Sequence, residues 1–199
     1  MHRQLPLNFS HACSALVIGA SAGGVEALLQ LLAGLPRSFG LPVIVVLHMS
    51  EERSSLLSEV FSYRLAVPVR EAVDKLPVEP GTVYFAPAGY HLLVEADESF
   101  SLSCDAREHY SRPSIDVLMD SAADVWGKDL AAVVLTGANQ DGAAGLARVG
   151  MAGGLTVVQE PSEAQSPVMP QAAIDLQAPD YVLPLQQIKH LIAQLRHEP

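Results

Sequence analysis

Short apolar runs alternate along the chain with segments in which apolar residues return every three or four positions. The runs are rich in Val, Ile and Leu with little polar alternation, as expected of strands covered on both faces. They occupy residues 15–20, 42–48, 130–137 and 154–160, and a shorter run opens the segment YVLPLQQIKHLIAQL. Because strands and helical segments alternate, the chain is predicted to form a doubly wound, mostly parallel α/β sheet with helices on both faces.

The helical segments each place their apolar residues on one face. The first follows residue 23 and ends near Gly34 and Pro36, which are typical of a helix C-terminus. Others are predicted at 53–65, after Ser114 as N-cap, at 142–152, in MPQAAIDL and at the C-terminal end. The expected buried positions are Val25, Leu28, Leu29 and Leu32 in the first helix, Leu57, Val60, Phe61 and Leu65 in the second, and Ile115, Leu118, Met119, Ala122 and Trp126 in the third.

The middle of the chain has a different pattern. The short runs VPVREAV, GTVYFAP, HLLVEA and SFSLSC are broken by Pro, Gly and Asp, which indicates an inserted β-hairpin or an antiparallel edge. With no internal repeat or linker, residues 1–199 are expected to form one domain, in which residues 1–13 are a poorly ordered N-terminal extension.

The composition of the chain argues against a membrane protein and against a nucleic-acid-binding protein. Hydrophobic residues make up 49% and charged residues 17% of the chain, so a well-buried interior is expected. No apolar run reaches the roughly 18 residues that a membrane helix needs, and no membrane insertion is expected. The net charge of −10, from 12 basic and 22 acidic residues without a basic cluster, argues against a nucleic-acid partner.

Neither a cofactor nor a metal site is indicated. Cys13 and Cys104 show no metal-ligand spacing and are expected to be reduced and structural. The stretch HACSALVIGASA resembles the apolar part of a signal peptide. It reads better as a buried strand and turn before a helix, so a cytoplasmic location is expected.

Polar residues follow the buried strands where each strand ends. Ser21 follows the first strand in a G-x-S-x-G context, His48 ends the second, and Asp141 follows the strand at 130–136 in TGANQDG. In a doubly wound sheet, function gathers outside the carboxyl ends of the strands. A nucleophile, a base and an acid are therefore expected on one edge of the sheet.

The turn around Ser21 allows three interpretations. Glycines at 19 and 23 permit a sharp strand-to-helix turn that holds a serine hydroxyl outward beside unpaired backbone N–H groups. A phosphate-binding turn is the second interpretation, but the pattern is not G-x-G-x-x-G, and no acidic residue follows at the expected distance to bind a ribose. A turn that serves only packing is the third.

The other two positions also have simpler explanations. His48 could be a hydrogen-bonded histidine at the edge of the core, although it alone among seven histidines ends a strongly buried strand. Asp141 could be the N-cap of the helix that follows it. As an acid it would orient the imidazole, and Glu160, after the strand at 154–158, competes for that role.

These stretches resemble a known family. VIGASAGGVEAL, VVLHMS, RPSIDVLMDSAA, VVLTGANQDGAAGLARV, MPQAAI and YVLPLQQI occur in the same order in the catalytic domain of the chemotaxis protein-glutamate methylesterases. The resemblance spans residues 14 to 192 and implies a doubly wound α/β sheet with an added hairpin. It also implies hydrolysis of γ-glutamyl methyl esters on the cytoplasmic part of chemoreceptors, with deamidation of glutamines in some members.

By position, the resemblance assigns the catalytic serine, histidine and aspartate to Ser21, His48 and Asp141. Ala22 and Ala138 are expected to support the oxyanion through their loops. Arg112 is expected on the same edge, in contact with the acidic receptor helix or as a surface arginine at a turn. No cofactor is implied, and the expected partner is the methylated cytoplasmic domain of a chemoreceptor-like protein.

The chain departs from the family pattern at several positions. The family has Thr where Ala22 follows the serine, and its loop reads T-G-M-G-x-D-G where this chain has Ala138, Asn139 and Gln140 before the aspartate. The chain also starts at the catalytic domain, without the usual receiver domain, so a separate receiver or regulatory protein is an expected partner. A binding module that no longer catalyses and a nucleotide-binding domain are the alternative functions.

Overall fold

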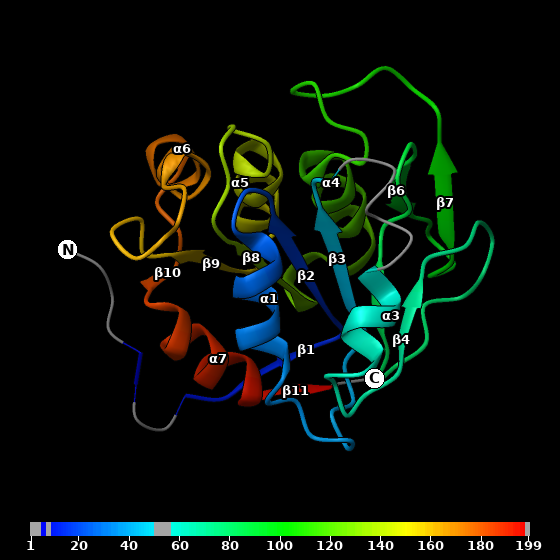
Figure 1. Cartoon of the computed structure of the whole chain (residues 1–199), viewed down its shortest axis with the longest axis horizontal. Helices are drawn as coiled ribbons and strands as arrows, with labels where there is room; N and C mark the ends of the chain where they lie inside the picture. The colour runs from blue at the N-terminus through cyan, green and yellow to red at the C-terminus, as the bar shows by residue number, and fades with distance from the viewer. Residues whose placement is uncertain (1–4, 7–8, 50–56, 198–199) are drawn as a thin grey trace.

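The computed structural model describes residues 5–6, 9–49 and 57–197. In this part of the chain, seven strands form one sheet in the order β10-β9-β8-β2-β3-β5-β4, and all neighbouring strands are parallel (Figure 1). The apolar runs account for five strands that are buried at every position, as predicted. They are β2 (Ala15–Ala20), β3 (Val43–Leu47), β8 (Leu130–Val134), β9 (Leu155–Gln159) and β10 (Tyr181–Leu183).

Helices cover both faces of the sheet. Side chains alternate along β2, so Leu16 and Ile18 join one core while Ala15 and Val17 join the other. The first core is closed by α1 (Gly24–Leu32), α3 (Leu57–Ser62) and α7 (Leu185–Ala193). The second is closed by α4 (Ile115–Trp126), α5 (Ala143–Met151) and α6 (Val168–Leu176).

The predicted helix faces are mostly confirmed. All five expected positions of α4 are buried. In α1 the buried face is rotated: Ala27 and Leu31 are buried beside Leu28 and Leu32, while Val25 and Leu29 are only partly buried. Positions 27, 28, 31 and 32 also recur one helical turn apart, and this stripe, which starts at Ala27 instead of Val25, faces the core. For the segment predicted at 53–65, Leu57, Phe61 and Leu65 are buried and Val60 is exposed, and residues 53–56 lie outside the described part.

The middle of the chain contributes to two sheets. The expected hairpin is formed by β6 (His91–Val94) and β7 (Phe100–Ser103), which are antiparallel. The other two runs do not form an antiparallel edge. Instead β4 (Val69–Glu71) and β5 (Val83–Phe85) extend the main sheet in parallel, and residues 72–82 form the crossover between them, near the short limit for parallel strands.

The N-terminal segment contributes a strand to a second, two-stranded sheet. Residues 11–13 were expected to be poorly ordered, but His11–Cys13 form β1, which pairs in parallel with β11 (Leu195–His197). Both cysteines are free. Burial, assisted by the charge of Asp129, raises the pKa of Cys13 to about 12, so this thiol is inert. No helix among the described residues has the length and apolar character required to cross a membrane.

The strand order decides where the polar strand ends lie. β2 sits between β8 and β3, and the order of the strands along the chain reverses at β2. Ala20 pairs with Leu47 and Gly19 with Val134. The loops after these three strands therefore leave the same edge of the sheet next to one another, at the switch point where doubly wound folds bind ligands.

Candidate active site

Ser21 lies between the other two strand ends. Its backbone N–H donates to the carbonyl of Thr136 at 2.9 Å, and the N–H of His48 donates to the carbonyl of Ala20 at 3.1 Å. The three predicted residues Ser21, His48 and Asp141 thus come from loops joined by backbone hydrogen bonds at one edge of the sheet.

The turn at Ser21 requires its glycines. Gly23 has a φ of 79° and immediately precedes α1, a backbone conformation that costs little only for glycine. A Cβ on Gly19 would lie 2.3 Å from Cγ2 of Ile115, at the start of α4. Gly19 therefore lets α4 approach β2 closely, and this approach brings the N-terminus of α4 to the site.

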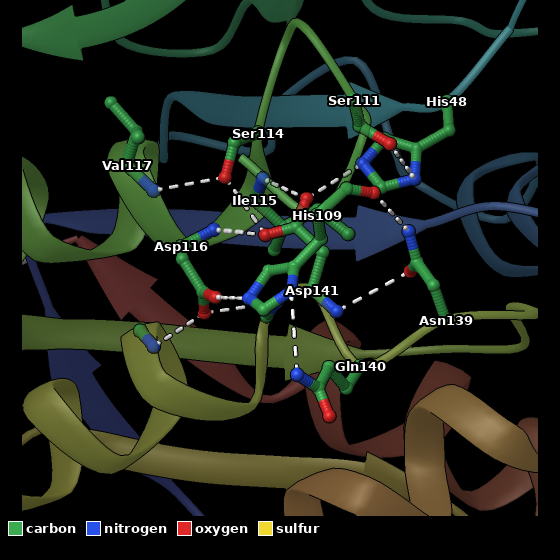
Figure 2. A network of polar contacts seen from close by, with 12 residues as sticks. His48, His109, Ser111, Ser114, Ile115, Asp116, Val117, Asn139, Gln140 and Asp141 are labelled. Atoms are coloured by element: carbon green, nitrogen blue, oxygen red, sulfur yellow. Dashed lines mark hydrogen bonds and ion pairs between the residues drawn. The ribbon is translucent and has the colours of Figure 1, made fainter. Parts of the chain in front are cut away.

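Asp141 is completely buried and accepts four hydrogen bonds (Figure 2). His48 Nε2 donates to Oδ2 at 2.7 Å, and the hydroxyl of Ser114 donates to Oδ1 at 2.8 Å. The backbone N–H groups of Ile115 and Asp116 donate at 2.8 and 3.0 Å. All four lone-pair positions of the carboxylate are therefore used.

The simpler interpretation, in which Asp141 caps the helix that follows it, is wrong. Asp141 caps α4 instead. The cap of α5 comes from α4 in return: Asp116 Oδ1 accepts from the backbone N–H of Gly142 at 2.9 Å and of Gly145 at 2.7 Å. The predicted N-cap of α4 is also formed, since Ser114 Oγ accepts from the N–H of Val117. The two helices thus exchange carboxylate caps, each satisfying N–H groups that a helix start leaves unpaired.

The two carboxyl groups have opposite pKa shifts. Burial raises the pKa of Asp141, but the hydrogen bonds from His48, Asp116 and Ile115 together outweigh it, and its pKa lies below the ordinary value. For Asp116, burial dominates and raises the pKa, with a smaller increase from the charge of Asp141. Asp141 is therefore ionised at neutral pH.

The ionised carboxylate fixes the tautomer of His48. A carboxylate only accepts hydrogen bonds, so Nε2 of His48 carries the proton and Nδ1 is the basic nitrogen. Nδ1 lies 3.3 Å from Oγ of Ser111. The expected hydrogen bond between Ser21 and His48 is not formed: the ring nitrogens of His48 face Asp141 and Ser111, and the Ser21 hydroxyl has no hydrogen-bond partner among the described residues.

The low pKa of Asp141 predicts an acid-sensitive stability. Because its folded-state pKa lies below the unfolded value of about 4, ionised Asp141 stabilises the fold above that pH, and this contribution disappears as the pH falls through the folded-state pKa. Asp116, with its raised pKa, acts in the opposite direction. We expect the free energy of unfolding to fall less steeply in acid for Asp141→Asn than for the wild type in urea titrations between about pH 3 and pH 7.

An exposed carboxylate provides the control for that titration. Asp175 accepts a hydrogen bond from Gln171 at the surface, and Asp175→Asn should keep the wild-type pH dependence. A slope for Asp141→Asn equal to that of the wild type would contradict the assignment of the acid sensitivity to Asp141.

Thr136 joins the loops that surround Ser21. Its buried hydroxyl donates to the carbonyl of Ala22 at 2.8 Å and accepts from the N–H of Ser166 at 2.9 Å, while its own N–H donates to Gln159. Ala22 and Ala138 are both exposed beside these contacts. The positions predicted to support an oxyanion thus lie on the two loops that Thr136 connects.

A hollow of about 290 Å³ opens beside His48, with Tyr110, Ser111 and Arg112 on its wall. Arg112 reaches this edge as expected, but one of its NH₂ groups is bound to the backbone carbonyls of Cys104 and Asp105 at 2.8 and 2.9 Å. Its Nε is buried without a partner among the described residues. Arg112 therefore supports the wall of the hollow.

Glu160, the competitor for the role of the acid, is directed elsewhere. Its carboxylate accepts from the N–H and hydroxyl of Ser162, and among the described residues Asp141 is the acid that contacts the imidazole of His48.

The site offers little to a metal ion. His109, Asp116 and Asp141 place ligand atoms within 4.8 Å of one another. However, both oxygens of Asp141 and Oδ1 of Asp116 already accept two hydrogen bonds each. What remains is Oδ2 of Asp116 and the ring of His109, 3.3 Å apart, which is too small a set for a stable cation site.

Sequence reasoning missed Ser111, His109 and Asp116. The segment that carries His109 and Ser111 lacks periodicity, and Asp116 reads as an ordinary first-turn acid of α4. A signal was present in Asp116, which comes two residues after the predicted N-cap Ser114. The sequence does not show that Asp116 caps α5, because that interaction depends on the contact between α4 and α5.

Comparison with known proteins places this geometry in a family. The family model described as CheB methylesterase matches residues 16–192. A putative protein-glutamate methylesterase/protein-glutamine glutaminase of Leptospira interrogans serogroup Icterohaemorrhagiae serovar copenhageni is 42% identical over 181 residues, covering 91% of this chain and 94% of that protein.

Two further proteins extend the similarity. The protein-glutamate methylesterase FrzG of Myxococcus xanthus is 38% identical over 181 residues, which cover 90% of this chain and 54% of FrzG. The crystal structure of the Thermotoga maritima CheB methylesterase catalytic domain superposes with a TM-score of 0.87 at 31% identity, covering 94% of this chain and 98% of that one. The predicted fold, a mostly parallel doubly wound sheet with an added hairpin, is therefore confirmed.

Proposed function

This chain belongs to the CheB methylesterase family, and we propose that it is a serine hydrolase that removes methyl groups from γ-glutamyl methyl esters of chemoreceptor-like proteins. The observation that carries the proposal is the buried hydrogen bond between Asp141 and His48 beside the strand-end turn of Ser21. A buried carboxylate that fixes the tautomer of an imidazole next to a serine at a helix N-terminus is an arrangement suited to acyl transfer.

The reaction starts at Ser21. As its hydroxyl attacks the ester carbonyl, Nδ1 of His48 accepts the hydroxyl proton, and the Ser21 oxygen forms a bond to the carbonyl carbon. The bond from that carbon to the methoxy oxygen then breaks, and His48 returns the proton so that methanol leaves. Water repeats the sequence on the glutamyl-enzyme: it gives a proton to His48, attacks the carbonyl carbon and displaces the Ser21 oxygen, which is reprotonated.

Asp141 contributes by holding His48. The carboxylate keeps the proton on Nε2 and stabilises the imidazolium that forms in each step. Since the burial and the four hydrogen bonds leave Asp141 no freedom to turn, the imidazole is oriented before the substrate arrives.

The oxyanion is assigned to the loops that carry Ala22 and Ala138. No described residue accepts a hydrogen bond from the backbone N–H of Ala22, which lies at the entrance to α1. Free N–H groups at a helix start can stabilise the negative charge that develops on a carbonyl oxygen. Ala138 lies on the opposite loop, tied to the first through Thr136.

The substrate is the methylated part of a chemoreceptor-like protein. Arg112, at the wall of the hollow beside His48, is assigned to contact acidic side chains of that substrate. The name of the Leptospira relative also includes protein-glutamine glutaminase. The same acyl-enzyme forms from a glutamine side chain when ammonia leaves in place of methanol, so deamidation is a second reaction of the same site.

Incubation with a methylated chemoreceptor fragment tests the proposal. We expect the purified chain to release methanol in proportion to the γ-glutamyl methyl esters lost, as measured by mass spectrometry of the receptor peptides. An unmethylated fragment containing glutamine at the same positions tests the deamidation. Unchanged ester peptides, with a well-folded chain, would reject hydrolysis and favour a binding module of the same fold.

A further inference from the structure

The segment before α4 contains a tight turn with an unusual backbone. The backbone N–H groups of Glu108 and Ser111 each donate to the other residue's carbonyl, at 3.1 and 2.7 Å. The two central residues, His109 and Tyr110, have φ values of 48° and 64°. Non-glycine residues adopt positive φ at a cost in free energy, so such a turn persists only where its surroundings hold it.

Three side chains hold this turn through His109 (Figure 2). Asp116 approaches His109 Nε2 at 3.3 Å, the side-chain amide of Gln140 meets Nδ1 at 3.4 Å, and the amide of Asn139 donates to the carbonyl of His109 at 3.4 Å. Asn139 and Gln140 precede Asp141 in the loop, and Asn139 occupies the position where the family pattern has glycine. The Asp141 loop and the turn are therefore connected through both side chains.

The turn presents Ser111 to the base of the proposed reaction. The hydroxyl of Ser111 lies 3.3 Å from Nδ1 of His48, and Nδ1 is the basic nitrogen because Nε2 donates to Asp141. A hydroxyl facing an unprotonated ring nitrogen donates to it. Ser111 thus occupies the nitrogen that Ser21 needs.

We propose that the turn 108–111 is a clamp that holds the base in a resting state, in which Ser111 is a positioning residue that competes with Ser21 for Nδ1 of His48. This inference rests on the function proposed above. Catalysis then requires the Ser111 hydrogen bond to be exchanged for one from Ser21 when the substrate enters the hollow beside His48. Ser111 controls how often the base is available and takes no part in bond making.

The test measures how fast a small fluorophosphonate labels Ser21, together with kcat and KM for a small glutamyl methyl ester. In the labelling reaction the Ser21 oxygen forms a bond to phosphorus, fluoride leaves and His48 takes the proton. We expect Ser111→Ala to be labelled about two- to tenfold faster than the wild type, as the loss of one competing hydrogen bond predicts. Its kcat should rise by a similar factor with KM unchanged.

Two variants keep the test specific. Ser111→Thr retains the hydroxyl and should return both rates to the wild-type range. Ser62→Ala removes a hydroxyl that is bonded to the carbonyl of Ser58 in α3 and should leave both rates unchanged. An equal or slower rate in Ser111→Ala, or labelling of Ser111 itself in the peptide map, would overturn the clamp. If the wild type is not labelled at Ser21 at all, the proposed function fails instead.

Discussion

Ser21→Ala is expected to abolish methyl ester hydrolysis, with a fall in kcat of about a thousandfold or more. The alanine has no oxygen to form the acyl-enzyme, so only the residual stabilisation by the loops remains. The fold should be unaffected, because the Ser21 hydroxyl has no partner among the described residues and the contacts of this residue come from its backbone. The measurement is methanol release from a methylated receptor fragment, with the unfolding free energy determined in parallel.

Ser62→Ala is the matched control for this substitution. It also removes a single hydroxyl, at a distance from the candidate site, and should retain wild-type turnover. Full activity of Ser21→Ala would show that another group forms the acyl bond, or that none forms, and the assignment of Ser21 would have to be withdrawn.

Asp141→Asn is expected to reduce kcat by about a thousand- to ten thousandfold and to destabilise the fold as well. Four hydrogen atoms point at this carboxylate, whereas an asparagine offers one oxygen and an NH₂ group that donates. If the NH₂ group faces His48, Nε2 must accept, the proton moves to Nδ1, and His48 can no longer take the proton of Ser21. If the NH₂ group faces the start of α4 instead, it meets hydrogen-bond donors there and cannot accept from them, so the helix cap is lost.

Asp180→Asn provides the comparison for the stability loss. Asp180 accepts from the N–H and hydroxyl of Thr156 at the opposite edge of the sheet, so its replacement should lower stability while kcat is retained. Activity is measured with the small glutamyl methyl ester and stability by urea unfolding at neutral pH. Retention of wild-type turnover in Asp141→Asn would be incompatible with a role in orienting His48.

Much of this arrangement could be predicted from local pattern. The buried strands are continuous apolar runs, and each functional side chain follows such a run, so the strand-end positions of Ser21, His48 and Asp141 were accessible from the sequence. The parallel sheet followed from alternation of strands with helices. The helical stripe of α4 was equally clear because large apolar residues dominate it.

The remainder depends on contacts between distant segments. Pairing direction cannot be read from a three-residue run, so β4 and β5 were expected in an antiparallel edge and belong to the parallel sheet. The turn 108–111 has no periodicity, and its approach to His48 depends on three side chains from other segments. Capping of the helix that follows Asp141 was the simpler alternative for this residue, whereas the close approach of α4 allowed by Gly19 gives Asp141 the start of a different helix to cap.

The exchange of carboxylate caps has a consequence for judging distant relatives. A descendant that had stopped hydrolysing esters would still lose the cap that joins α4 to the Asp141 loop if it replaced Asp141. The hydroxyl of Ser21, in contrast, makes no hydrogen bond to any described residue. Selection for a stable fold alone would therefore preserve the aspartate and let the serine drift. In an unfamiliar sequence of this kind, survival of the serine is the informative sign of chemistry, and survival of the aspartate by itself is not.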